Sequence, residues 1–170
     1  MGFRGRMLSA PVSSHMQTEL YQKDVYLVKE SDTFPVINEK ILSPENRRKA
    51  AVVSDEDGRV TGLIRSIDLI NAFRTRYKNF LEEGTNNLEN MTAREIMDLR
   101  KTSGHPFRYP CLSIDATIGD FLKERRKCKE LKPHPSQDVV VVGKNGEFYG
   151  FFTIEDVLKA MPMYSMSMYS

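Results

Sequence analysis

The sequence predicts an α+β fold built from two copies of one small unit, each with the order strand, helix, strand, strand, helix. A hairpin pattern occurs twice along the chain, and each hairpin leads directly into an amphipathic helix, so one repeated unit accounts for most of the sequence. The chain has 170 residues, of which 40% are hydrophobic. That is enough apolar material for one compact domain or two small packed halves.

Each hairpin consists of two apolar strands around a tight turn, over residues 50–64 and 139–152. Asp-Gly and Asn-Gly, which stand in the two turns, are strong hairpin signals because they tolerate the positive φ that matches the twist of paired strands. In both copies a second glycine lies four residues after the turn glycine, and an aspartate lies six residues after that. These pairs are Gly62 with Asp68 and Gly150 with Asp156. The agreement in register indicates a duplicated unit.

Helices and short strands surround each hairpin in the same order. Apolar residues recur at helical spacing after each hairpin, and Asp and Thr residues precede the upstream helices as N-caps. The predicted helices cover about 33–42, 66–76, 118–131 and 153–161, and the predicted short strands cover 25–28 and 111–114.

Residues between and outside the two copies have weaker patterns. Residues 77–90 lose periodicity around Gly84-Thr85-Asn86-Asn87, and Thr92 and Glu95 form a capping box that opens a short helix through Met97. An irregular connection at 132–137 includes His134, and a helix cannot continue past Pro162. We expect both ends to be mobile or dependent on a partner. The predicted organisation is an N-terminal extension at 1–20, a first unit at 21–80, a linker with a short helix at 81–106, a second unit at 107–161 and a flexible tail at 162–170.

The composition excludes several classes of protein. A formal net charge of +2 is too balanced for a dedicated nucleic-acid binder. Two cysteines without CxxC spacing favour a reducing compartment, and we expect a cytoplasmic protein. No apolar run approaches the ~20 residues that cross a bilayer. Three scattered histidines predict no metal site.

The two hairpin segments resemble a known family. Asp55–Asp68 and Gly146–Asp156, with Met91–Met97 as the helix that introduces the second copy, are similar to the CBS domain. This strand-helix-strand-strand-helix unit normally occurs in tandem and packs into a pseudo-twofold pair. The resemblance runs from about Asp24 to Met161. It implies a regulatory module, usually a homodimer of pairs, that needs no cofactor and binds AMP, ADP, ATP or S-adenosylmethionine as an effector in the crevice between the units.

The resemblance places the ligand site at the start of the last helix of each unit. Thr153 and Asp156 match the family's pattern of Thr or Ser with Asp or Asn. A hydroxyl beside helix-terminal amides suits a phosphate, and a carboxylate one turn later can accept both hydroxyls of a ribose. Apolar strand residues would enclose the purine ring; the candidates are Cys111, Leu112, Val140 and Val52.

The first copy departs from this pattern because Arg65 stands where the family has Thr or Ser. Ser66 and Asp68 are in place, and an arginine can still meet a phosphate. Arg48, within the basic run Arg47-Arg48-Lys49 before the hairpin, is a further candidate, as the family often reaches phosphate from this region. The first site is therefore expected to be empty or to select a different ligand.

Other interpretations of the same residues stay open. Thr153 with Asp156 is also an ordinary N-terminal cap, and basic runs usually lie in water. The main alternative function is a structural module that has lost its ligand and dimerises through apolar helix faces. An enzyme is not favoured because no phosphate loop, nucleophile with base or metal cluster occurs. Binding of single-stranded nucleic acid has only local basic clusters in its favour.

Overall fold

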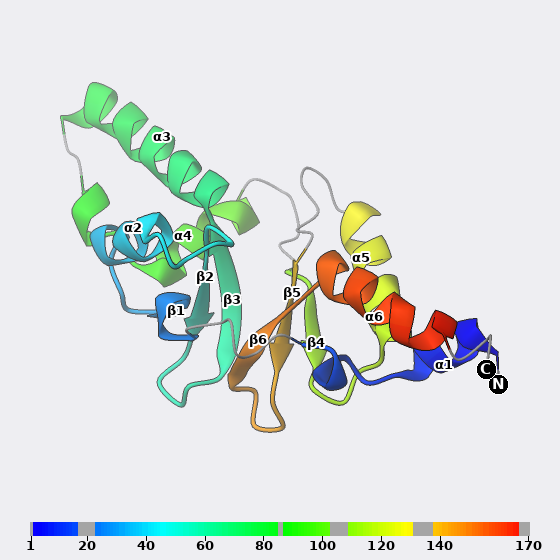
Figure 1. Cartoon of the computed structure of the whole chain (residues 1–170). Helices are drawn as coiled ribbons and strands as arrows, with labels where there is room; N and C mark the ends of the chain where they lie inside the picture. Colours follow the sequence, from blue (N-terminus) through cyan, green and yellow to red (C-terminus); the bar gives the residue numbers. More distant parts are fainter. Residues whose placement is uncertain (1, 17–22, 85–86, 103–108, 131–137, 167–170) are drawn as a thin grey trace. The chain divides into compact units, whose positions relative to one another are not determined.

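The computed structural model describes residues 2–16, 23–84, 87–102, 109–130 and 138–166 (Figure 1). The chain divides into two compact units, each with its own three-stranded sheet and helices. The first unit is Gln22–Phe107, and the second unit combines Met1–Tyr21 with Arg108–Ser170. This confirms the predicted α+β class with two small sheets packed on helices. The irregular connection expected at 132–137, including His134, lies outside the described residues.

The first unit has the sheet order β1-β2-β3, with β1 parallel to β2 and β2 antiparallel to β3. A parallel pair needs a crossover, and α2 provides it between β1 and β2. The elements of this unit are η3 (Lys23–Val25), β1 (Leu27–Lys29), α2 (Phe34–Leu42), β2 (Ala50–Ser54), β3 (Val60–Arg65), α3 (Ser66–Glu83), η4 (Leu88–Asn90) and α4 (Ala93–Thr102).

The second unit repeats this topology with the sheet order β4-β5-β6. The turn glycines Gly58 and Gly146 have φ of 79° and 80°, as the Asp-Gly and Asn-Gly signals require. A register shift follows at the same place in both hairpins. The elements are α1 (Phe3–Ser9), η1 (Val12–Ser14), β4 (Cys111–Ser113), α5 (Ile118–Glu130), β5 (Asp138–Val142), β6 (Phe148–Thr153) and α6 (Ile154–Met166).

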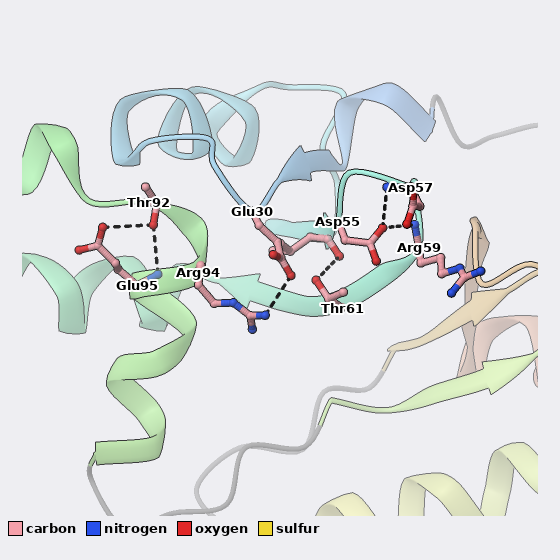
Figure 2. Close-up of polar contacts among 9 residues, drawn as sticks. Glu30, Asp55, Asp57, Arg59, Thr61, Thr92, Arg94 and Glu95 are labelled. Atoms are coloured by element: carbon pink, nitrogen blue, oxygen red, sulfur yellow. Dashed lines mark hydrogen bonds and ion pairs between the residues drawn. The ribbon is translucent and has the colours of Figure 1, made fainter.

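Polar contacts hold the turn and the last helix of the first unit in place (Figure 2). The Asp55 carboxylate accepts the backbone N–H groups of Asp57 and Arg59, both at 2.9 Å. At the start of α4, the Glu95 N–H donates to the Thr92 hydroxyl at 3.2 Å, as the predicted capping box requires of its N-cap, and the Thr92 hydroxyl donates to the Glu95 carboxylate at 3.3 Å.

Each unit has one apolar core between its sheet and its helices. In the second unit, Phe121 of α5 packs edge-to-face on Phe152 of β6, with ring centroids 4.8 Å apart. The buried core residues of the first unit are Val28, Ile37, Ile41, Ala51, Val53, Ile64, Leu69, Ala72, Met91, Ala93, Ile96 and Met97. Those of the second are Met7, Ala10, Val12, Ile118, Phe121, Val139, Val141, Phe152, Val157 and Ala160.

The structure adds one element to the repeat that the sequence did not reveal. Thr92 forms a β-bridge with Thr33, and Pro11 forms the same bridge with Thr117. The carbonyl of Ala10 accepts the N–H of Ile118 at 2.9 Å, as the carbonyl of Met91 accepts that of Phe34 at 2.8 Å. Residues 10–16 and 91–97 are thus the same segment in two copies, which we call the lead-in segments.

The lead-in segments correct the expectation that the N-terminus lacks structure. Residues 2–16 contain α1 and η1 and pack with the second unit, where α1 lies beside α5 and α6 (Figure 1). Each lead-in segment therefore belongs to the unit that does not directly follow it in the sequence.

A methionine of each lead-in segment covers a glycine of each hairpin. A Cβ atom at Gly62 would overlap the sulfur of Met97, and one at Gly150 would lie 2.8 Å from Cε of Met16. The absence of a Cβ atom at both positions lets the methionine approach the strand backbone this closely, and any larger residue would displace the methionine. This close approach of a methionine explains why the second glycine recurs in each copy.

Three helices, α3, α4 and α6, are longer than the sequence predicts. α3 continues to Glu83 instead of ending near Arg76, and α4 continues past Met97 to Thr102. The segment after Arg76 is rich in good helix formers, and α3 ends where Gly84 adopts a φ of 72°. Tyr77 and Leu81 continue the apolar spacing of α3 on an exposed face, so this segment is helix and not loop.

α6 continues through Pro162 to Met166, so the prediction that the helix ends at this proline is wrong. Proline removes one N–H bond, the one to the carbonyl of Leu158, and this turn of the helix is exposed to water. Tertiary contacts hold the last turn, since Tyr164 packs on the core of the second unit and its hydroxyl lies 2.7 Å from Nε2 of His15.

We expect Gly62→Ala to lower the free energy of unfolding by about 1–3 kcal/mol, because the new methyl group overpacks a closed site. Gly150→Ala should cost less, since only the mobile end of the half-buried Met16 side chain must move. Urea denaturation of both variants measures the difference. In a Met97→Ala background, Gly62→Ala should lower the free energy of unfolding by less than it does in the wild type. An equal loss in both backgrounds would show that Met97 does not crowd this position.

Candidate ligand site

The two predicted ligand residues of the second unit form a buried, reciprocal helix cap. β6 ends at Thr153 and α6 begins at the next residue, and the side chains of Thr153 and Asp156 are each 3% exposed. The Asp156 N–H donates to the Thr153 hydroxyl at 3.2 Å. In return the Asp156 carboxylate accepts the Thr153 backbone N–H at 2.9 Å and its hydroxyl at 3.1 Å. The capping interpretation is therefore correct for these residues.

A cap of this kind does not exclude a ligand contact. A carboxylate offers about four acceptor positions, and Thr153 uses two of them on one oxygen of Asp156. The helix N-terminus also keeps its positive end, which favours a nearby anionic group. The pair thus fixes the strand-to-helix junction and brings a hydroxyl and a carboxylate together there.

The first unit keeps the aspartate of this junction but not the hydroxyl. The Asp68 carboxylate accepts the Arg65 backbone N–H at 2.7 Å, and the Asp68 side chain is buried. The Ser66 hydroxyl donates instead to the carbonyl of Lys49 at 3.4 Å. Asp68 is therefore a cap too, and its matching position in both copies is explained by capping without a ribose.

The strand register shows which predicted residues share a face of the second sheet. Val140 pairs with Cys111 on one side and Phe151 on the other, and Thr153 lies two residues beyond Phe151. Because side chains alternate along a strand, these four residues lie on the face opposite the helix-covered core. Leu112 instead packs against that core and lies on the other face, so the structure does not bring Leu112 and Val140 together.

The first sheet has the same arrangement. Val52 pairs with Leu27 and Leu63, and Arg65 lies two residues beyond Leu63 on the face away from the core. Leu27, Leu63 and Phe151 also lie on these two sheet faces and were not among the predicted ligand residues. The alternation of side chains between the two faces of each hairpin strand is the signal that would have identified them.

Cys111 lies in a small cluster of titratable groups that the sequence did not reveal. The pKa of its thiol is raised to about 11, first by burial and then by the nearby charge of Glu124, against a lowering effect of its hydrogen bond with Tyr109. Burial also raises the pKa of Tyr109 to about 12. Both groups therefore keep their protons at neutral pH, and the thiol is a poor nucleophile there.

Arg48 is half-buried in the loop that joins α2 to β2. Across the described ranges, no three His, Cys, Asp or Glu residues are grouped so that they could hold a metal ion. Within the same residues, no helix combines the length and the apolar character that crossing a membrane demands.

Comparisons with known proteins agree with this architecture. Residues 18–75 match the CBS domain family model. A CBS domain-containing protein of unknown function from Bacillus anthracis str. Ames Ancestor has a similar structure, with a TM-score of 0.61 and 14% identity over 94% of this chain and 98% of that one. A hypothetical conserved protein from Geobacillus kaustophilus has a TM-score of 0.60 and 18% identity, covering 90% and 96%.

A third similar structure is CBSX2 in complex with AMP, with a TM-score of 0.58 and 14% identity over 92% of this chain and 98% of that one. A comparison with curated protein sequences finds no match. The two sheets and their capped junctions define a protein of tandem strand-helix-strand-strand-helix repeats. The match to the CBS domain family lies in the first unit, and the second unit repeats the same fold. CBS domains are regulatory modules.

The raised pKa of Cys111 predicts that its alkylation is slow at neutral pH. In a Cys128→Ser variant, the rate of reaction with iodoacetamide should rise with an inflection near pH 11, because burial raises the pKa of the Cys111 thiol to about 11. The same variant unfolded in urea should react with an inflection near pH ~8.5, typical of a free cysteine. Coinciding inflections in the folded and unfolded protein would show that the thiol is not held in its protonated form.

Proposed function

We propose that this chain is a regulatory ligand-sensing module that binds an adenine nucleotide or a related adenosyl effector at the second unit. The candidates are AMP, ADP, ATP and S-adenosylmethionine. The observation that carries the proposal is the junction of β6 and α6, where Thr153 and Asp156 bring a hydroxyl, a carboxylate and a helix N-terminus together at the edge of an apolar strand face. The similar fold of CBSX2, whose structure contains AMP, supports the choice of ligand.

Each part of the ligand has a matching group in this unit. The positive end of α6 favours a phosphate, and the Asp156 carboxylate suits the hydroxyls of a ribose. The apolar side chains of Val140 and Phe151 lie on the same sheet face as Thr153 and would cover a purine ring. Asp156 therefore has two roles in the proposal, as the cap of α6 and as a ligand contact.

The proposed output is regulation without catalysis. A ligand that prefers one arrangement of the module shifts the population toward that arrangement, by as much as its affinity differs between the two. An associated protein, in the cytoplasm on our proposal, would respond to this shift. The proposal assigns no bond-making step to any residue of the chain.

Asp156→Asn tests the ligand site against a matched cap. Asp120 makes the same reciprocal contacts with Thr117 at the start of α5, at 2.9 and 3.2 Å. Both Asp156→Asn and Asp120→Asn should lose about 1 kcal/mol or less of stability, as caps do. A saturating effector should raise the melting temperature of the wild type and of Asp120→Asn, equivalent to about 2.7 kcal/mol at a hundredfold excess over Kd.

The shift should be absent in Asp156→Asn, measured by thermal denaturation with each of the four effectors at millimolar concentration. If none of them raises the melting temperature of the wild type, the sensing function is rejected. If Asp156→Asn keeps the full shift, the site lies elsewhere.

The second candidate function is a dimerisation module, and one observation favours it. α3 carries a stripe of exposed apolar side chains at helical spacing, formed by Ile67, Ile70, Phe73, Tyr77 and Leu81. The rings of Phe73 and Tyr77 stack on each other with centroids 6.0 Å apart. An exposed apolar stripe of this length is typical of a surface that pairs with another protein, here a second copy of the chain.

Phe73→Lys should shift the chain from dimer to monomer in light scattering after gel filtration, because a charge in an apolar interface is costly to desolvate. Thr75→Lys is the control, since Thr75 is exposed on the same helix outside the stripe. A wild-type chain that is monomeric at micromolar concentration, or equal effects of the two variants, would argue against this function.

A further inference from the structure

The exposed face of α5 in the second unit carries more cations than acids. Lys123, Arg126 and Lys127 are exposed, and their spacing of three and four residues places them on one face of the helix. Among the residues that the structure describes, neither Arg126 nor Lys127 forms an ion pair with a carboxylate. Asp120 is also exposed on α5, and its carboxylate accepts the Thr117 backbone N–H at 2.9 Å, which lowers its pKa more than the charge of Lys123 does. This face, which we call the basic face, therefore keeps an excess of positive charge.

The corresponding helix of the first unit does the same structural work with balanced charge. α2 and α5 each join the first strand of a sheet to the second. α2 contains one acid, Glu39, and one cation, Lys40, whose ammonium group donates to the carbonyl of Asp24 at 2.6 Å. The fold therefore does not require a basic face on this helix. The helix dipole favours cations in the last turn, but Lys123 lies in the middle of α5, so the dipole does not account for it.

α1 is a second basic helix, and it lies against α5 (Figure 1). It contains Arg4 and Arg6 and no acidic residue, and Arg4 is exposed. The backbones of the two helices meet closely, since a Cβ atom at Gly119 would lie 3.0 Å from the carbonyl oxygen of Leu8. Two helices in contact, one from each end of the second unit's sequence, thus both carry an excess of cations.

An anionic bilayer fits the basic face better than a protein or a nucleic acid does. The centre of a protein interface is apolar and poor in lysine, whereas Leu122 is the large apolar side chain that α5 exposes among its described residues. Single-stranded nucleic acid stacks on aromatic rings, but Phe121 of α5 is buried, and a net charge of +2 is low for a nucleic-acid binder. Anionic lipid headgroups attract clustered Lys and Arg through charge alone. Leu122, beside Lys123, can enter the headgroup region while the long cationic side chains reach the phosphates.

We propose that the basic face of α5, formed by Lys123, Arg126 and Lys127, docks the chain on an anionic membrane surface. The contact is peripheral and reversible, because a few cations supply a modest attraction that salt screens. It needs no helix that crosses the bilayer. The proposal does not rest on the adenosyl site, since Asp156 belongs to the start of a different helix, α6.

The experiment is flotation of the full chain with vesicles, either of phosphatidylcholine alone or of equal parts phosphatidylcholine and phosphatidylglycerol. The wild type should float with the anionic vesicles and not with the neutral ones. Its partition coefficient should fall steeply between about 0.1 M and about 1 M salt, because the screening length shrinks. Each cation removed should weaken binding about fivefold, so Arg126→Gln/Lys127→Gln should lose on the order of twenty-fivefold.

The matched control is Arg74→Gln/Lys78→Gln on α3, which removes the same two residue types from exposed positions and changes the net charge equally. It should bind as the wild type does, and an unchanged melting temperature shows that both double variants fold. Equal weakening by the two double variants, or no binding to anionic vesicles at low salt, would overturn the proposal. So would tighter binding to duplex DNA, single-stranded RNA or polyglutamate than to the vesicles at equal charge. Asp156→Asn should lose the effector response and keep vesicle binding, which separates this proposal from the proposed function.

Discussion

The structure depends on a direct junction between a strand and a helix, made once in each unit. At both junctions an aspartate three residues into the turn accepts the backbone N–H of the last strand residue, Thr153 in one unit and Arg65 in the other. This bond is buried in the second unit and partly buried in the first, and losing the buried one would leave an amide without a partner and cost about 1–3 kcal/mol. It fixes where the helix begins, and it therefore fixes the position of the side chain at the end of the strand. Whatever chemistry that side chain carries is presented at the same point in both units.

The lead-in segments give the duplicated fold its second constraint. Residues 10–16 pack with the second unit and residues 91–97 with the first, although each precedes the other unit in sequence. Met16 and Met97 then cover Gly150 and Gly62, the glycines of the two hairpins. The second unit is discontinuous in sequence, because Val12 belongs to its buried core, whereas the first unit contains Ala93 and the rest of its core within residues 22–107. Folding of the second unit thus requires a segment that precedes the first unit in the sequence, so its core is complete only when both ends of the chain come together.

Local patterns were sufficient to predict the hairpins, their turns and the repeat, because Asp-Gly and Asn-Gly signals and strand alternation act over a few residues. They were insufficient wherever a tertiary contact decides the outcome. α6 passes Pro162 because Tyr164 is held by the core and by His15, more than a hundred residues away in sequence. The first lead-in segment is too short to show a periodicity, and its role appears only through its bonds to Ile118 and Ala116. For the site, residue types at the junction were predictable, but the face on which Leu112 lies required the strand register.

The two junctions share a backbone and differ in one side chain, and this difference separates what the fold requires from what a ligand requires. If capping were the whole function of the junction, Thr would serve in both units, since its hydroxyl adds a bond to the Asp156 N–H that Arg65 cannot supply. The first unit gives up that bond, and its Ser66 hydroxyl donates instead to the carbonyl of Lys49. The start of the helix is nevertheless retained, because the Asp68 carboxylate accepts the backbone N–H of Arg65 as Asp156 accepts that of Thr153. The aspartate is therefore what the junction requires of the fold, and the side chain at the end of the strand can differ between the two units.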